Sequence, residues 1–431
     1  MNILVIGSGA REHVIVWKLS QSKRVSHIYC APGNPGMESL GTLVALKATD
    51  LEGLRAFATE KAIDLTIVGP EQPLAEGIVD LFTLHRLAIF GPSKNASELE
   101  WSKAFAKDFM SRHNIPTAGY RVFRRGEIDD ARAHVTTCAL PVVLKADGLA
   151  AGKGVLICRT REEAVDALHT VLEGGTFGRA GNTLVVEEFM EGEEASVFAL
   201  TDGSDFLTLA PAQDHKRVFD DDRGKNTGGM GAYAPASIVS PDMMRVIHES
   251  IIAPTLGGMK AEGRPYRGCL YVGLMITADG PKVVEYNCRF GDPETQVVLP
   301  IYEGDILPLF LATQNGEVGK LKDSHLVRVA SGSAVCVVLA SGGYPDAYAT
   351  GMEIRGLDRV QKRPGIMVFH AGTRRVDDRI ESAGGRVLGI TAVVRSGSVR
   401  DAIDAAYSAV RDVTFEGMHY RRDIGKKGVG D

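Results

Sequence analysis

The sequence predicts a mixed α/β and α+β protein. An amino-terminal doubly wound parallel sheet is followed by a larger α+β domain and a small mixed carboxyl-terminal domain. Over the first hundred residues, short apolar runs alternate with helix-length segments, and several runs end in turns rich in glycine and proline. This alternation is typical of a parallel sheet whose ligands bind at the carboxyl ends of its strands. Farther along, strand-like runs are separated by long glycine-rich loops, which indicates a different architecture.

The expected elements divide the 431 residues into three domains and a short tail. The domains are expected at 1–101, 102–326 and 327–425, with a mobile lid at about 122–192 and a frayed polar tail at 426–431. A single amphipathic helix is predicted over 97–112. Strands are predicted at 3–6, 25–30, 65–68, 87–90, 141–145, 184–188, 195–200, 270–276, 282–286, 334–339, 367–370 and 387–394, and further helices at 11–19, 51–61 and 398–410.

Composition and charge narrow the class of function. Hydrophobic residues make up 44% and charged residues 24%, as in an ordinary globular protein, and the net charge of -5 argues against nucleic-acid or membrane partners. Neither a signal peptide nor a membrane-spanning run is evident. The six cysteines lack metal-site spacing and are expected to be reduced and buried. We therefore expect a cytoplasmic protein, a monomer or weak dimer, that acts on small molecules.

The first glycine cluster, 7–12, follows the first predicted strand and is similar to a dinucleotide-binding turn. The third glycine of that motif is replaced by Glu12, and a carboxylate there would oppose a pyrophosphate at the helix amino terminus. Two interpretations remain open: a tight strand-to-helix turn, or a site for a single phosphate held by the helix end and Arg11. Nicotinamide binding is the less favoured alternative.

A second cluster, 145–155, places Lys145 at the end of a predicted strand and follows it with a loop of small residues. Such residues let backbone N–H groups approach phosphate oxygens, and Lys153 adds a second positive charge. The lysine is not followed by serine or threonine, so this is not a Walker A loop. A β-hairpin with a flexible turn is the structural alternative.

An acidic linker at 187–194 joins two predicted strands and could recognise a nucleoside. An adenine ring needs an apolar slot with a few backbone donors and acceptors, and a ribose needs a carboxylate. Glu187, Glu194 and the backbone of Phe189 and Met190 could provide these groups. The intervening acidic residues are expected to form a solvated turn.

The run 285–294 places Glu285, Asn287 and Arg289 on one face of a predicted strand. Two oxygen ligands on one face suit Mg²⁺, whose octahedron is completed by water and phosphate oxygens. Arg289 could clamp an anion beside them. An exposed cross-strand ion pair would account for Glu285, but not for the repeated orientation of the other two residues.

A basic run at 213–217 and a glycine-rich segment at 226–232 suggest a further anion site. The three aspartates between them, 220–222, are expected to form a solvated loop rather than a metal site. His215 could be a general base, but an amine attacking an acyl phosphate does not need a strong one. We therefore expect no catalytic role for His215.

Taken in order, these motifs resemble the ATP-grasp superfamily and, within it, the glycinamide ribonucleotide synthetase (phosphoribosylamine–glycine ligase) family. The resemblance covers essentially the whole chain. It is carried by GSGAREH (7–13), APGNPG (31–36), IVGPEQPL (67–74), SKAFAKDFM (102–110), KADGLAAGKGV (145–155), EEFMEGEEAS (187–196), QDHKR (213–217), NTGGMGAY (226–233), EYNCRFGDPETQ (285–296), SGGYP (341–345), FHAGT (369–373) and GGRVL (384–388).

The resemblance implies a role for each matching residue. The central domain would be the ATP-grasp domain, with the loop 146–154 as a lid over the nucleotide phosphates. Many relatives carry a further glutamate on the preceding strand. Here that strand, 271–275, has no carboxylate, which leaves the coordination of a second metal open. The implied ATP-binding residues are Lys103, Lys145, Gly148, Gly152, Lys153, Gly154, Glu187, Glu188, Phe189, Met190 and Glu194. The implied ligands of Mg²⁺ or Mn²⁺ are Glu285 and Asn287, and the implied catalytic residues are Lys145, Arg289 and Asp214. The implied substrate-binding residues are Gly9, Arg11, Glu12, Gly33, Asn34, Glu71, Asp214, Lys216, Asn226, Gly228, Gly229 and Arg289.

The implied reaction joins glycine to 5-phosphoribosylamine with ATP, through a glycyl phosphate, in purine biosynthesis. Another ATP-grasp carboxylate–amine ligase with a different acceptor is the nearest alternative. No biotin-type or glutamine-amidotransferase module is visible in the sequence, which disfavours the relatives that carry one. A nicotinamide oxidoreductase and a non-catalytic nucleotide-sensing module are more distant alternatives.

Overall fold

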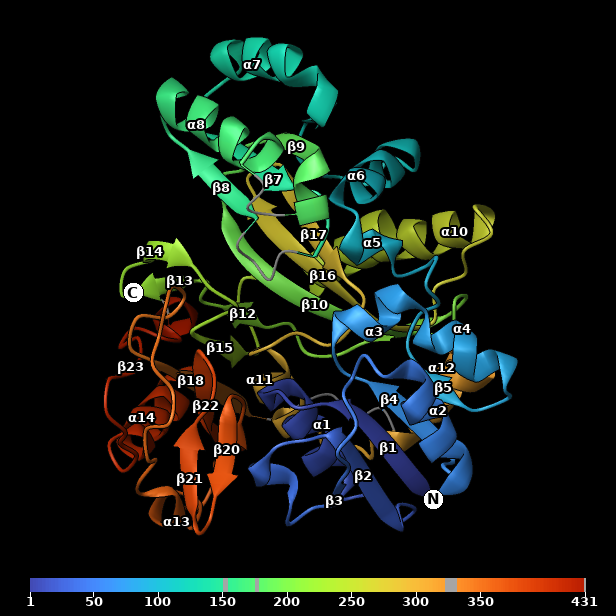
Figure 1. The fold of residues 1–431 in the computed structure, drawn as a ribbon, viewed down its shortest axis with the longest axis vertical. Coiled ribbons are helices and arrows are strands. Elements are labelled where there is room, and N and C mark those ends of the chain that lie inside the picture. Colours follow the sequence, from blue (N-terminus) through green and yellow to red (C-terminus); the bar gives the residue numbers. More distant parts are fainter. Residues whose placement is uncertain (150–153, 175–177, 322–331, 430–431) are drawn as a thin grey trace.

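The protein is described by a computed structural model that covers residues 1–149, 154–174, 178–321 and 332–429. Figure 1 shows the sheet of the predicted lid at the top, a second sheet at the centre, here called the central sheet, and the amino- and carboxyl-terminal sheets side by side below them. No helix within the described ranges is long and apolar enough to cross a membrane. The mixed architecture confirms the predicted fold class.

The amino-terminal region is a five-stranded parallel sheet in the order β3-β2-β1-β4-β5. The chain starts in the middle of the sheet and turns both ways, so the carboxyl ends of β1 and β4 flank the point where the strand order reverses. Buried aliphatic residues on both faces explain the continuous apolar runs in the sequence. The elements are β1 (Asn2–Gly7), α1 (Ala10–Leu19), β2 (His27–Pro32), η1 (Pro35–Met37), β3 (Thr42–Leu43), α2 (Leu51–Glu60), β4 (Leu65–Val68), α3 (Glu71–Glu76), α4 (Ile78–Leu84) and β5 (Ile89–Phe90).

The lid is a four-stranded antiparallel sheet in the order β6-β9-β7-β8, with two helices packed on it. It has a hydrophobic core of its own, formed by residues such as Val135, Leu144, Leu168 and Leu184. A separate core lets this part of the chain fold as a compact unit. Its elements are β6 (Tyr120–Arg124), η2 (Arg125–Glu127), α7 (Ile128–Thr137), β7 (Val142–Ala146), β8 (Val155–Cys158), α8 (Arg161–Leu172), η3 (Gly178–Asn182) and β9 (Thr183–Glu188).

A second antiparallel sheet, in the order β11-β10-β16-β17, lies below the lid. The same core holds residues of this sheet, such as Val197 and Val272, and of the amino-terminal sheet, such as Leu4 and Ile6. The two regions are therefore packed as one body. The elements are α5 (Glu98–Trp101), α6 (Lys103–Arg112), β10 (Glu193–Thr201), β11 (Phe206–Thr208), α9 (Pro241–Ile247), η4 (His248–Ile252), α10 (Ala253–Ala261), β16 (Gly268–Thr277), β17 (Gly280–Asn287), α11 (Thr295–Ile301), α12 (Leu307–Asn315) and η5 (Val318–Leu321).

The carboxyl-terminal sheet takes two strands from the middle of the chain. Its order is β12-β15-β18-β22-β19, with β23 also paired to β18. Because β15 pairs with β18 along Gly231–Ala234, the segment after β12 is held by the last domain. The elements are β12 (Gln213–Asp214), β13 (Arg217–Phe219), β14 (Arg223–Asn226), β15 (Gly231–Ala234), β18 (Ser333–Ser341), α13 (Leu357–Val360), β19 (Ile366–His370), β20 (Thr373–Val376), β21 (Arg379–Ser382), β22 (Arg386–Val394), α14 (Val399–Val410), β23 (Met418–His419) and η6 (Lys426–Val429).

Two sequence-based expectations need correction. The single helix predicted over 97–112 is two helices, because Ser102 adopts an extended backbone and its Oγ accepts a hydrogen bond from the Phe105 amide, which caps α6. The tail is not frayed over 426–429, where it forms η6 and Lys427 pairs with Asp222. The aspartates at 220–222 lie in an exposed turn, as predicted, and the side chains of two of them also bond to the carboxyl-terminal segment.

Candidate active site

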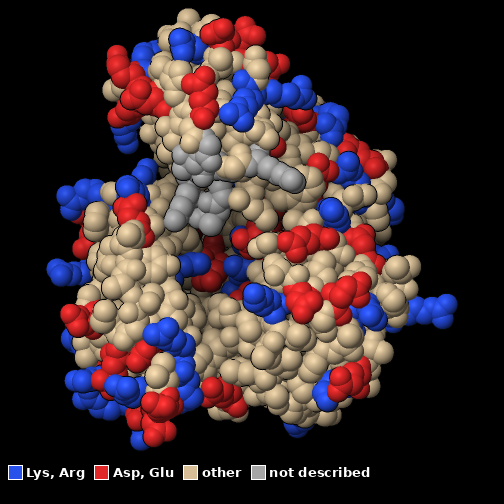
Figure 2. Space-filling model, viewed as in Figure 1, with Lys and Arg blue, Asp and Glu red and all other residues tan. Residues whose placement is uncertain are grey.

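A cavity of about 570 Å³ lies between the lid, the central sheet (β11-β10-β16-β17) and the carboxyl-terminal sheet. Figure 2 shows acidic and basic side chains gathered in the hollow at the centre of the molecule. Most of the residues predicted from the sequence meet here. Those lining the cavity are Arg11, Glu71, Lys103, Lys145, Gly148, Gly154, Glu187, Glu188, Phe189, Met190, Glu194, Asp214, Lys216, Asn226, Gly228, Glu285, Asn287 and Arg289.

The lid wall of the cavity carries two lysines joined by one glutamate. Lys145 on β7 places its Nζ 2.9 Å from Glu187 Oε1, and Lys107 on α6 places its Nζ 2.8 Å from Glu187 Oε2. Burial lowers the pKa of Lys107 to about 8, although Glu187 opposes this effect. The Glu187 carboxylate, which the sequence suggested for nucleoside recognition, is therefore engaged in orienting Lys145.

Lys103 lies in the first turn of α6, where the cap at Ser102 aims the start of the helix at the cavity. Its Nζ donates a hydrogen bond to the carbonyl of Gly148, 2.9 Å away, at the start of the predicted phosphate loop. Burial lowers the pKa of Lys103, while Glu285 counteracts it. Gly148 has a positive φ of 119°, a conformation that favours glycine. Gly152 and Lys153 lie outside the described residues.

The same cavity has an apolar part, here called the apolar slot, and Phe189 and Met190 also line the cavity. The slot is lined by Val143, Ile157 and Met275. Apolar walls next to free backbone groups are suited to a flat heteroaromatic ring. The sequence reasoning named the linker but not these three residues, because each is an ordinary strand residue with no motif of its own.

Glu285 and Asn287 face the cavity from β17, as predicted. Burial raises the pKa of Glu285, but Lys216, Lys145 and Lys103 outweigh it and hold that pKa below its usual value. The partners of Asn287 and Glu285 on β16 are Tyr271 and Gly273, so that strand adds no carboxylate. Among the described residues there is no cluster of three histidine, cysteine or acidic side chains that could hold a metal. Two oxygen donors fit Mg²⁺, which leaves most of its positions to water and phosphate.

Arg289 is fixed by acidic residues on two helices of the neighbouring region. Its Nε lies 3.2 Å from Glu71 Oε2, and its Nη2 lies 2.9 Å from Glu100 Oε1. Burial opposes ionisation of Glu71, but Arg289 and Arg11 outweigh burial and lower the pKa of Glu71 to about 2. The guanidinium also donates to Asn287 Oδ1 over 3.2 Å, so Arg289 holds the second predicted metal ligand in place.

Asp214 and Lys216 form the wall opposite the lid. Lys216 Nζ lies 2.6 Å from Glu194 Oε2 and 4.0 Å from Glu285 Oε1. Burial, reinforced by Glu294, Glu194 and Glu285, raises the pKa of Asp214 to about 8 even though Lys216 opposes it. This wall therefore combines one protonatable carboxyl group with a lysine that lies close to several carboxylates.

Several cavity residues were missed by the sequence reasoning. Arg386 Nη1 donates to the carbonyl oxygens of Gly228 and Asp292 over 2.6 and 2.7 Å, and the Tyr344 hydroxyl accepts from the Gly228 amide over 3.0 Å. Glu294 accepts from the Tyr271 hydroxyl over 2.8 Å. These residues stood inside the matching segments 285–296, 341–345 and 384–388, but nothing in the spacing of those segments assigned them a role.

Five predicted substrate residues do not line the cavity: Gly9, Glu12, Gly33, Asn34 and Gly229. Glu12 fills the turn after β1, because its Oε2 accepts from the Gly9 amide over 2.6 Å and its side chain occupies the space beside Gly9. The Asn34 amide donates to the carbonyls of Ser8 and His370, which joins the amino- and carboxyl-terminal regions. A turn filled by its own carboxylate leaves no room for a pyrophosphate and disfavours the nicotinamide alternative.

Together, a lid sheet, a central antiparallel sheet and a cavity between them that contains lysines and two candidate metal ligands, Glu285 and Asn287, define an ATP-grasp enzyme. Models of the phosphoribosylglycinamide synthetase family match the whole architecture: the N domain over residues 1–100, the ATP-grasp (A) domain over 101–295 and the C domain over 334–427. The chain belongs to this family of ligases. This confirms the family predicted from the sequence.

Individual relatives agree. The chain is 49% identical over 433 residues to the phosphoribosylamine–glycine ligase of Chlorobaculum tepidum, covering 100% of both chains. It is 49% identical over 432 residues to the enzyme of that name from Vibrio vulnificus, covering 100% of this chain and 99% of the relative. The crystal structure of phosphoribosylamine–glycine ligase from Thermotoga maritima has a TM-score of 0.83 and 34% identity, covering 98% of this chain and 100% of that one.

A more distant structure shares the fold alone. The biotin carboxylase domain of the Hydrogenobacter thermophilus 2-oxoglutarate carboxylase was solved with MgADP, ADP and bicarbonate. It has a TM-score of 0.74 at 19% identity and covers 97% of this chain and 91% of its own. The fold is thus shared with proteins of little sequence similarity.

Proposed function

We propose that this protein ligates glycine to 5-phosphoribosylamine at the expense of ATP, through a glycyl phosphate, and so acts in purine biosynthesis. The observation that carries the proposal is the convergence of Lys103 and Lys145, Glu285 and Asn287, and Asp214 and Lys216 on one cavity. Full-length identity of 49% to relatives named phosphoribosylamine–glycine ligase supports the choice of substrates.

ATP lies along the lid wall in this proposal. The apolar slot takes the adenine ring, and Lys103 and Lys145 neutralise the phosphates. Glu187, paired with Lys145 at 2.9 Å, prevents that side chain from turning away. Catalysis then depends on placing the γ-phosphate next to the glycine carboxylate and offsetting the charge that develops.

Glu285 and Asn287 would hold a divalent cation, Mg²⁺ or Mn²⁺, which when bound would neutralise charge on the phosphates and the transferring phosphoryl group. The depressed pKa of Glu285 keeps this ligand ionised near neutral pH. Arg289 keeps Asn287 oriented through its 3.2 Å hydrogen bond and adds positive charge beside the reacting groups.

Glycine lies against the opposite wall. The Asp214 carboxylate accepts hydrogen bonds from the ammonium group of glycine, and Arg289 and the segment 226–229 surround the carboxylate of glycine. A carboxylate oxygen attacks the γ-phosphorus, the bond to the β–γ bridging oxygen breaks, and ADP leaves. The amine of phosphoribosylamine then attacks the acyl carbon, the C–O bond to phosphate breaks, and the amine loses a proton. The products are glycinamide ribonucleotide, ADP and phosphate.

The chain's own side chains are not needed as nucleophiles in this scheme. Burial raises the pKa of Cys30 and Cys336 to about 12, and of Cys158 to about 11, so these thiols stay protonated. The His215 ring is buried away from the cavity, and burial lowers its pKa to about 4. The acyl phosphate therefore remains non-covalently bound.

The remaining expectations stay predictions: the domain boundaries near 101 and 326, the binding of the ribose 5-phosphate near Arg11 and Glu71, a monomer or weak dimer, and a cytoplasmic location. Arg11 supports the second of these, because it lines the cavity and its Nη1 lies 3.8 Å from Glu71 Oε2.

The proposed activity is tested by phosphate release from ATP with phosphoribosylamine present, comparing glycine with alanine and serine. Glycine should give turnover, and the larger amino acids should give little. If glycine-dependent turnover does not require phosphoribosylamine but requires another amine, the protein would be a different ligase of the same superfamily. ATP hydrolysis indifferent to the amino acid would contradict the proposal.

A further inference from the structure

Residues 213–219 run from β12 through His215 and Lys216 to β13, and this stretch, here called the strand, presents Asp214 and Lys216 to the cavity, but not His215 between them. His215 is 1% exposed and does not line the cavity. The His215 amide donates a hydrogen bond to the Gly231 carbonyl, and the His215 carbonyl accepts one from the Met230 amide. These bonds join the strand to the start of β15. The back of the strand is covered by the carboxyl-terminal segment, residues 419–427.

This segment contacts the back of the strand at three residues, His215, Arg217 and Val218. The Gly425 amide donates to His215 Nε2 over 3.4 Å, and Arg421 Nη1 donates to the Arg217 carbonyl over 3.1 Å. His419 Nε2 lies 2.9 Å from the Val218 carbonyl, which can only accept. The contacts start at the residue between Asp214 and Lys216 and continue directly beyond Lys216.

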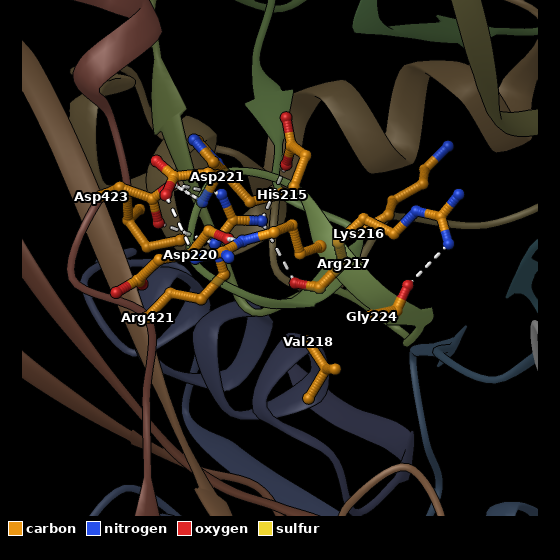
Figure 3. A network of polar contacts seen from close by, with 12 residues as sticks. His215, Lys216, Arg217, Val218, Asp220, Asp221, Gly224, Arg421 and Asp423 are labelled. Carbon is orange, nitrogen blue, oxygen red and sulfur yellow. Dashed lines mark hydrogen bonds and ion pairs between the residues drawn. The ribbon is translucent and has the colours of Figure 1, made fainter.

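Arg421 organises these contacts. Only 1% of this residue is exposed, and its guanidinium makes a bidentate pair with Asp423, at 2.8 and 2.6 Å, and a third bond to Asp222 Oδ1, at 2.8 Å. Asp222 also accepts from Lys427 over 2.6 Å. Figure 3 shows Arg421 and Asp423 lying against Asp220 and Asp221 beside the strand that carries His215 and Lys216.

The loop on the other side of the network is held in a demanding conformation. Asp221 and Asp222 have φ values of 57° and 50° in the turn between β13 and β14. Two consecutive positive φ values suit a tight hairpin, and aspartate tolerates them better than most residues. The Asp221 amide donates to Asp423 Oδ2 over 2.9 Å, and Asp220 Oδ1 accepts from the Arg422 amide over 2.7 Å. An ion-pair network with a buried, fully bonded arginine at its centre specifies one arrangement of the groups that it joins.

We propose that the carboxyl-terminal segment, through Arg421, positions Asp214 and Lys216 for glycine binding. Arg421 is a positioning residue, because it lies behind the strand and touches no substrate. The assignment of glycine to this wall rests on the proposed function, whereas the positioning of the strand does not.

The test compares Arg421→Gln with Arg422→Gln, a matched change at the next residue, whose side chain is exposed. Two quantities are measured: hydrogen exchange of the His215, Thr227 and Met230 amides, which bond across this strand, and the KM values for glycine and ATP. In Arg421→Gln these amides should exchange faster, and the glycine KM should rise about tenfold or more with the ATP KM changed less than about twofold. Arg422→Gln should match the unmodified protein.

Unchanged exchange and an unchanged glycine KM in a folded Arg421→Gln protein would overturn the proposal, and so would a fall in kcat with the glycine KM unaffected. If Arg421→Gln does not fold, Asp222→Asn decides by the same readouts, because it removes only a half-exposed partner of Arg421. If the unmodified protein shows no glycine-dependent turnover, the proposed function fails, and amide exchange alone still decides whether Arg421 positions the strand.

Discussion

The two walls of the cavity differ in how their charges are balanced. On the lid wall, Glu187 is shared by Lys107 and Lys145 within 2.9 Å, so one carboxylate fixes two cations and a net positive charge remains. On the opposite wall, Asp214 is buried near three other carboxylates with Lys216 as the neighbouring cation, and its pKa rises to about 8. The first wall is preorganised for a polyanion that always carries charge. The second is a site whose charge responds to an incoming cation.

The largest effect should come from the lid wall. Lys145→Ala removes a cation aimed at the phosphates, and glycine-dependent ADP formation should fall on the order of 10²–10³-fold, as when one preorganised donor to a transition state is lost. The matched control is Lys23→Ala, which removes an exposed lysine of the amino-terminal region and should be silent. Steady-state rates, with circular dichroism to check folding, measure the change. Full activity in Lys145→Ala would remove the distinction between the walls.

Between the walls, Glu285→Gln should raise the Mg²⁺ concentration needed for half-maximal activity by about 10–100-fold, because a neutral amide is a poorer ligand than a carboxylate. Asp279→Asn, at the exposed turn between β16 and β17, is the matched control. A Mg²⁺ titration of ADP formation measures both. The same Mg²⁺ dependence in the two variants would contradict the assignment of Glu285.

The opposite wall should make the affinity for glycine depend on pH. Because the pKa of Asp214 is raised to about 8, the empty site holds a neutral carboxyl group at pH 7. Binding the glycine ammonium favours the carboxylate, so binding releases a proton and affinity should increase as pH rises from about 6 to 8, by up to about tenfold per unit. The glycine KM measured across this range tests it. Asp214→Asn should bind weakly with a flat profile, and an equally steep profile in that variant would show that another group titrates.

The smallest effect is expected from the cysteines, which belong to neither wall. Five of the six are buried. Alkylation of the native protein with iodoacetamide should reach Cys138 alone and leave turnover unchanged within about twofold, because buried, protonated thiols react slowly. Mass spectrometry of the labelled protein, alongside its rate, would detect the alternative: a specific loss of chemistry on labelling any one thiol.

The difference between the walls also explains what the sequence could predict. Lys145, Glu187, Glu285 and Asn287 lie on regular strands, where alternation fixes the direction of each side chain, and all four face the cavity. The parallel sheet could likewise be predicted from its apolar runs and turns. Local periodicity was sufficient wherever one strand carried the whole feature.

The opposite wall was less predictable because it is assembled from distant segments. Arg386, Tyr344 and Glu100 reach the cavity from positions 42 to 286 residues apart in the chain, and no local spacing indicates such contacts. Ser102, where the helix breaks, and the buried Arg421 each have a partner far away in the sequence, Asp147 and Asp222 respectively. The glycine turn at 7–12 was ambiguous for a related reason: only the structure places Glu12 in the space that a phosphate would need.

The central claim is that the glycine carboxylate becomes an acyl phosphate. It is tested most directly with glycine labelled with oxygen-18 in both carboxylate oxygens, incubated with ATP, Mg²⁺ and phosphoribosylamine. Attack by a carboxylate oxygen on the γ-phosphorus transfers that oxygen to phosphate. The released phosphate should therefore carry one labelled oxygen per turnover, as measured by mass spectrometry. Phosphate released without label, while glycinamide ribonucleotide accumulates, would contradict the account.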